Sequence, residues 1–172
     1  EVRANPAYLK QYELLKAKAV ENTGNGLLFE NTAIAFDTLQ SALQLWQQAG
    51  DKHGIASTNA SMAEYFTIKG DHINALKYYQ TSLNIYKELN DTFFTGWITY
   101  NIGLIQRYMG NYGDALESHV KTLQIGKQIN NNELITQALL GNGFDYMLVK
   151  NYPEALKNQR EALEIFTAIK DS

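Results

Sequence analysis

The sequence predicts an all-α fold, a right-handed α-solenoid of about four stacked helix-turn-helix repeats. Three observations support this prediction: an alanine that recurs at a fixed interval, helical spacing of the apolar residues, and turn-forming residues between the helical stretches. The alanines are Ala35, Ala75, Ala115 and Ala155, each 40 residues after the last. Self-similarity at such an interval is typical of repeats that bury their apolar faces by stacking on one another.

Other columns of the sequence keep the same period. The residue after each alanine is aromatic or leucine: Phe36, Leu76, Leu116 and Leu156. A polar residue closes each unit: Asp51, Asp91, Asn131 and Asp171. These columns predict one array over residues 1–172, with approximate units at 15–54, 55–94, 95–134 and 135–172 and an added helical segment at 1–14.

Within a unit, two amphipathic stretches flank a turn. In the third unit Leu116, Val120 and Leu123 recur every three or four residues, and residues 97–108 show the same spacing upstream. Between them, residues 109–114 read Met-Gly-Asn-Tyr-Gly-Asp. Glycine is favoured just after a helix, and Asn or Asp just before one. Each unit is therefore predicted to consist of helix A, a tight turn and helix B.

The two ends of the array depart from this pattern. Residues 23–26 read Thr-Gly-Asn-Gly where the first helix A should run, and a helical glycine costs about 1 kcal/mol relative to alanine. Either that helix ends near Asn22, or the glycines allow close packing within a continuous helix; a degenerate, cap-like first unit is typical of terminal repeats. At the other end, no polar capping helix follows the last helix B before Ser172. We expect the chain to be a piece of a longer protein.

Composition excludes several classes of partner. The 172 residues are 45% hydrophobic and 19% charged, which is enough apolar material for a core. A formal net charge of −3 gives no electrostatic basis for binding nucleic acid or an anionic membrane. No apolar run approaches the roughly 18 residues of a membrane span. We therefore expect no nucleic-acid partner and no membrane contact by this segment.

Residues for catalysis or metal binding are not grouped along the sequence. The absence of cysteine excludes disulfides and thiolate metal sites. His53, His72 and His119 lie in different units or turns, and none has a carboxylate three or four residues further on. There is no phosphate-binding glycine loop, and the Ser and Thr residues lack a partnered base. We expect no enzymatic activity, no metal and no cofactor.

The residues quoted so far resemble the tetratricopeptide repeat family. Gly103 and Gly143 stand where that family keeps a small helix-packing residue, Phe66 and Tyr146 match its helix A aromatic residue, and the recurring alanines match its near-universal alanine. The resemblance covers roughly residues 15–172. The usual period is about 34 residues, and the proline that normally ends helix B is absent, so helix B is expected to run on. This is similar to the long-repeat type found in kinesin light chains, spindle-orientation adaptors and many bacterial signalling proteins.

The resemblance implies that function lies on the concave face lined by the A helices. Counting along the family's helix A gives the candidate peptide-binding positions Glu64, Trp97, Tyr100, Asn101, Leu104, Arg107, Leu140, Phe144 and Met147. The Lys and Asn set with which some relatives clamp a carboxylate tail is missing. An apolar, aromatic groove with Arg107 and Glu64 as polar points suits a hydrophobic peptide or an amphipathic helix.

Some of these assignments have alternatives. Trp97 and Tyr100 could line the groove or pack between repeats, and Asn101 could hold a peptide backbone, as in long-repeat relatives, or be a surface amide. The leading functional prediction is a scaffold that binds a protein or peptide. The alternative is a sensory segment of a larger bacterial signalling protein, such as a histidine kinase, nucleotide cyclase or transcription regulator, that acts on its own output domain. The segment would then be soluble, in the cytoplasm or periplasm, and exposed array ends would allow self-association.

Overall fold

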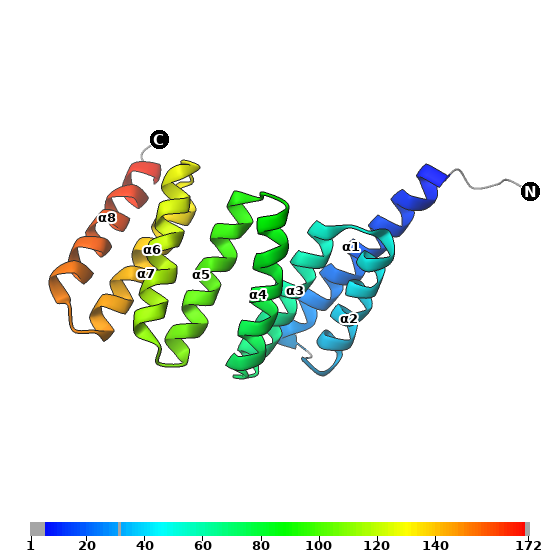
Figure 1. Ribbon diagram of the computed structural model, residues 1–172, viewed down its shortest axis with the longest axis horizontal. Coiled ribbons are helices and arrows are strands. Elements are labelled where there is room, and N and C mark those ends of the chain that lie inside the picture. Colours follow the sequence, from blue (N-terminus) through cyan, green and yellow to red (C-terminus); the bar gives the residue numbers. More distant parts are fainter. Residues whose placement is uncertain (1–5, 31, 171–172) are drawn as a thin grey trace, which may run out of the picture. The chain divides into compact units, whose positions relative to one another are not determined.

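The computed structural model describes residues 6–30 and 32–170, so the predictions for Asp171 and Ser172 lie outside the described residues. The described residues form eight helices and no strand (Figure 1). The helices are α1 (Pro6–Glu30), α2 (Thr32–Ala49), α3 (Lys52–Ile68), α4 (His72–Glu88), α5 (Thr92–Tyr108), α6 (Tyr112–Gln128), α7 (Asn132–Leu148) and α8 (Tyr152–Lys170).

The helices belong to two compact units, Glu1–Leu89 with α1–α4 and Asn90–Ser172 with α5–α8. In the first unit each helix packs on the next along the chain, and α1 also contacts α3. The second unit repeats this arrangement, with α5 also contacting α7. Successive packed helix pairs confirm the predicted all-α solenoid class.

The recurring alanines are all buried. Ala35, Ala75 and Ala115 are 0% exposed and Ala155 is 3% exposed. A methyl side chain allows two helices to approach closely, so a larger residue in this column would overpack the contact. The period seen in the sequence therefore has a packing cause.

Short caps join the helices, as the turn residues predicted. Asp51 and Asn131 each accept a hydrogen bond from the backbone N–H three residues on, at 2.8 Å. Gly70 and Gly110 follow α3 and α5 with φ of +73° and +81°, in the left-handed region that glycine tolerates best. Lys150 occupies the same place after α7, with φ +62°. Its Cβ atom makes this left-handed conformation less favourable than it is for glycine.

The first helix is continuous across the glycines at residues 24 and 26. Helix α1 runs unbroken from Pro6 to Glu30, so the interpretation in which it ends near Asn22 is wrong. A Cβ atom added to Gly24 would lie 2.8 Å from Cδ2 of the fully buried Leu39 on α2. The glycine is therefore needed for the close approach of α1 and α2.

Candidate protein-binding surface

Eight of the nine predicted binding residues lie on two helices of the second unit that contact each other. Helix α5 carries Trp97, Tyr100, Asn101, Leu104 and Arg107, and helix α7 carries Leu140, Phe144 and Met147. We call these eight residues the α5–α7 face. Glu64 lies on α3 in the first unit, where burial raises the pKa of its carboxyl group.

The α7 part of this face is an exposed apolar row. Leu140, Phe144 and Met147 are 41%, 52% and 43% exposed, and their spacing places them on one side of the helix. Covering exposed apolar surface is favourable by about 25 cal/mol per Å². Three large side chains in a row therefore offer a partner more contact energy than isolated exposed residues would.

The residues of this face that lie on α5 are more buried than those on α7. Trp97, Tyr100 and Leu104 are half-buried, and the Tyr100 ring centroid lies 5.1 Å from that of His119 on α6. Burial raises the pKa of the Tyr100 hydroxyl, and the nearby Arg107 cation partly opposes this. Trp97 and Tyr100 are thus partly buried and partly exposed, and their lining of a peptide groove stays a prediction.

Asn101 uses part of its amide within its own helix. Its Nδ2 donates to the carbonyl oxygen of Trp97 at 2.9 Å, one turn earlier. Such bonding to the preceding turn is common for short polar side chains in helices. Contact between Asn101 and a peptide backbone stays a prediction.

Arg107 is held in one position by three contacts with α7. Its Nε donates to Asp145 Oδ1 at 2.7 Å, and its Nη2 donates to the Gly141 carbonyl oxygen at 3.0 Å. Its Cζ atom lies 5.5 Å from the centroid of the Phe144 ring, a cation–π distance. The guanidinium is therefore pre-positioned at the surface, with a side chain only 17% exposed.

Beneath Arg107, His119 fills a closed space between α5 and α7. The side chain is 0% exposed, and Cβ atoms added to Gly103 and Gly141 would meet its ring at 2.6 and 2.8 Å. Its Nδ1 lies 2.5 Å from Asp145 Oδ2 and 3.5 Å from Nη2 of Arg107. Its Nε2 is buried and has no hydrogen-bond partner among the described residues.

Sequence reasoning missed this Arg107–Asp145–His119 cluster. It assigned Arg107 as an isolated polar point of the groove and gave Asp145 no role. A signal was present, because Asp145 falls in a column that holds Tyr65 and Ile105 in the two preceding units. The column holds Asn25 in the first unit, so none of its other members is charged. A carboxylate in such a column indicates a buried charge that needs a partner.

The first unit contains a separate cavity of about 310 Å³, lined by the middle of α1, the end of α2 and the start of α3. It is lined by Lys18, Glu21, Trp46, Asp51, His53, Gly54 and Ser57. The buried carboxylate of Glu21 accepts from Ser57 Oγ at 2.5 Å and from Lys18 Nζ at 2.9 Å. Its oxygens are therefore already bonded within the protein, which explains how the charge is tolerated there.

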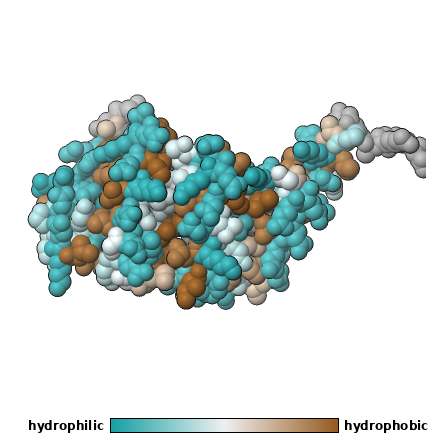
Figure 2. Space-filling model, viewed as in Figure 1, coloured by the Kyte–Doolittle hydropathy of each residue, from teal (hydrophilic) through white to brown (hydrophobic). Residues whose placement is uncertain are grey.

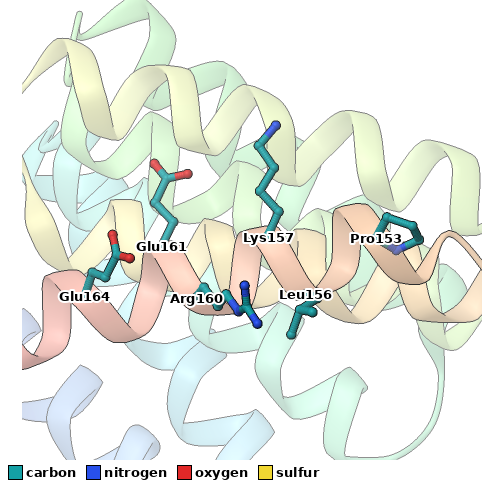
Figure 3. Close-up of a pocket in the computed structure, with 6 residues that line it drawn as sticks. All are labelled: Pro153, Leu156, Lys157, Arg160, Glu161 and Glu164. Atoms are coloured by element: carbon teal, nitrogen blue, oxygen red, sulfur yellow. The ribbon is translucent and has the colours of Figure 1, made fainter.

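Helix α8 carries an open depression of about 500 Å³ along its surface. In Figure 3, Lys157 and Glu161 extend from one side of this helix and Leu156 and Arg160 from the other. Two further apolar side chains of α8, Leu163 and Phe166, are 61% and 64% exposed. The depression lacks the buried polar groups and enclosure of a small-molecule site.

Other features limit the possible chemistry. Figure 2 shows hydrophilic side chains over most of the visible surface, with hydrophobic ones emerging between them. No helix in the described part of the chain is long and apolar enough to cross a membrane. Residues 6–30 and 32–170 contain no group of three or more His, Cys, Asp or Glu side chains arranged to hold a metal ion.

Comparison with known families agrees with the architecture. The tetratricopeptide repeat profile matches residues 28–88 and 54–128, which is more than half of the chain. The chain belongs to the tetratricopeptide repeat family, whose repeats are generally non-catalytic scaffolds. No curated protein matches this chain.

Three solved structures share the fold. Aspartyl phosphate phosphatase F from Bacillus subtilis has a TM-score of 0.87 at 14% identity, over 92% of this chain and 42% of that one. A signal transduction ATPase with a tetratricopeptide repeat sensor, from Pyrococcus horikoshii, has a TM-score of 0.83 at 21% identity, over 92% and 25%. BtubC (BKLC) from P. vanneervenii has a TM-score of 0.78 at 17% identity, over 100% and 69%. This chain spans less than half the length of the first two.

Proposed function

We propose that this protein is an interaction module that binds an apolar peptide or helix of a partner protein on the α5–α7 face. Membership of a family of scaffolds supports a protein partner. The observation that carries the proposal is the exposed row of Leu140, Phe144 and Met147 next to the half-buried aromatic residues of α5.

The charge pattern of the face supports the same class of partner. Helix α5 contains no acidic residue, and its one charged residue is Arg107. On α7 the two carboxylates are Glu133, in the first turn, and the fully buried Asp145. A surface depleted in charge and rich in aromatic and aliphatic side chains is typical of the centre of a protein interface.

A pair of matched phenylalanine variants tests the proposal. Peptides from a random displayed library are selected on the whole chain, and their affinities are measured for the wild type, Phe144→Ala and Phe166→Ala. Both phenylalanines are exposed, at 52% and 64%, but Phe166 lies on α8 outside the face. We expect Phe144→Ala to weaken binding about tenfold or more, as truncation of a central aromatic residue does, and Phe166→Ala to leave it unchanged. Equal effects of the two variants would reject the assignment of the face.

A second candidate places this interaction inside a larger protein. Two proteins that share the fold, the phosphatase and the sensor-bearing ATPase, are more than twice as long as the matched region. The α5–α7 face would then hold an output domain of the same polypeptide, or an effector peptide that regulates it. Sequencing the reading frame on both sides tests this candidate: a kinase, cyclase or DNA-binding domain supports it, and an immediate stop codon rejects it.

A further inference from the structure

On the basis of the proposed function, we propose that Arg107 selects the partner by donating a hydrogen bond from Nη1 to a free main-chain carbonyl of the bound apolar segment. The guanidinium of Arg107 bonds to α7 through two of its three nitrogens. Nε bonds to Asp145 and Nη2 to the Gly141 carbonyl, while Nη1 has no partner among the described residues. The donors of a guanidinium form a rigid fork, so two fixed nitrogens also fix the direction of the third.

Binding at the face would remove water from this nitrogen. The Phe144 ring lies 5.5 Å from the Arg107 Cζ atom, so a segment that covers the ring also covers the guanidinium edge. A donor that loses water without gaining an acceptor opposes binding by the full cost of its desolvation. A partner that binds well must therefore bring an acceptor to Nη1.

The acceptor is expected to be neutral. Asp145 is fully buried and already balances the charge of Arg107 through a 2.7 Å contact. A second carboxylate at Nη1 would face Asp145 across one guanidinium and would lose its own hydration in an apolar surface. A carbonyl oxygen satisfies the donor without either penalty.

The state of the partner backbone follows from the same requirement. Carbonyl groups inside a helix already accept bonds from the next turn, whereas those of the last turn and of extended segments are free. The partner is therefore an apolar segment whose backbone is extended, or ends its helix, where it meets Arg107. A continuous helix lying along the face with its middle at Arg107 would leave Nη1 unsatisfied.

An ester scan of a selected peptide tests the proposal. Each main-chain amide of the peptide is replaced in turn by an ester, whose carbonyl is a weaker acceptor, and binding is measured to the wild type and to Arg107→Lys. Lysine keeps a positive charge beside Asp145, so the buried carboxylate keeps its counterion, but lysine lacks the Nη1 donor. We expect one ester position to weaken wild-type binding by up to about tenfold and to have no effect on binding to Arg107→Lys.

The possible outcomes separate this proposal from the proposed function. If Phe144→Ala weakens binding but no ester position distinguishes the wild type from Arg107→Lys, the face is correct and the role of Arg107 is wrong. Selected peptides that need an Asp or Glu side chain would overturn the neutral acceptor. Peptides indifferent to Phe144→Ala would overturn both proposals. If Arg107→Lys does not fold, the double variant Arg107→Met with Asp145→Asn removes both charges together, keeps an amide beside Nδ1 of His119, and serves in its place.

Discussion

Substituting alanine for Gly103 tests the packing around His119 most directly. The new Cβ atom would lie 2.6 Å from His119 Nε2, which is 0.8 Å inside the 3.4 Å lower limit of ordinary contact. The His119 ring cannot move aside, because Gly141 lies against it on α7 and its Nδ1 is bonded to Asp145. The helices themselves must therefore shift.

The change in the free energy of unfolding caused by Gly103→Ala is the cost of overpacking minus the gain in helix propensity. Overpacking a close-packed core costs about 1–3 kcal/mol. Alanine recovers up to about 1 kcal/mol of helix propensity relative to glycine, so Gly103→Ala should lower the free energy of unfolding by about 0–2 kcal/mol relative to the wild type, and by about 1–3 kcal/mol relative to a glycine-to-alanine variant without overpacking. Gly113→Ala is the matched control: Gly113 is also helical, but nothing lies within 4 Å of an added Cβ atom, and this variant should be unchanged or slightly more stable.

The two tryptophans make the assay specific for each unit. Trp97 lies in the second unit and Trp46 in the first, so single-tryptophan variants report urea unfolding of each unit separately. We expect Gly103→Ala to shift the Trp97 transition more than the Trp46 transition, since repeat stability is a sum of local and nearest-neighbour terms. A Gly103→Ala protein as stable as Gly113→Ala would refute the packing of His119 between the glycines.

Three further predictions concern the caps. Asn131→Ala should destabilise the protein by about 1 kcal/mol in urea unfolding, because it removes a 2.8 Å cap bond, whereas Asn111→Ala removes none and should cost less. Lys150→Gly should raise the melting temperature by relieving a left-handed lysine, and Asn130→Gly should do so less, since Asn tolerates that region; equal shifts would contradict this reasoning. Hydrogen bonds from Asn74 lower the pKa of Asp71, so its contribution is present above the unfolded value of about 3.9 and is lost as pH falls through the lower folded value. Asp71→Asn should therefore lose less stability than the wild type on acidification, as measured by melting temperature against pH.

The sequence predicted the fold well because the same pattern recurs in each unit. A residue with no clear preference in one unit is therefore outweighed by the matching residues of the others. The alanine column marks buried positions, and the caps at Asp51 and Asn131 follow from residue types with strong local preferences. Continuity of α1 could not be decided, because the packing of Gly24 against Leu39 depends on a neighbouring helix that local propensity does not include. Tertiary contact there overrides the cost of a helical glycine.

The candidate site was predicted only in outline for a related reason. Helical spacing places Leu140, Phe144 and Met147 on one side of α7, and this required only the sequence. The orientation of Arg107 depends on Asp145, 38 residues further along the chain, and on the backbone oxygen of Gly141. Pairings over such distances are set by the packing of whole helices, which periodicity within one helix does not describe.

A buried ion pair is a poor way to stabilise a helical repeat. Its desolvation offsets most of its attraction, and replacing such groups together by apolar residues is often neutral or stabilising by about 1–4 kcal/mol. Asn25, Tyr65 and Ile105 occupy the column of Asp145 in the three preceding units, so a carboxylate is not a requirement of the repeat. What Asp145 does in this unit is hold the guanidinium of Arg107 against Phe144 at the surface. If recognition by Arg107 is the reason for the pair, the double variant Arg107→Met with Asp145→Asn, whose amide can still bond to Nδ1 of His119, should keep most of its stability in urea and lose discrimination between amide and ester peptides. A double variant that lost stability and kept discrimination would show that the pair serves folding alone.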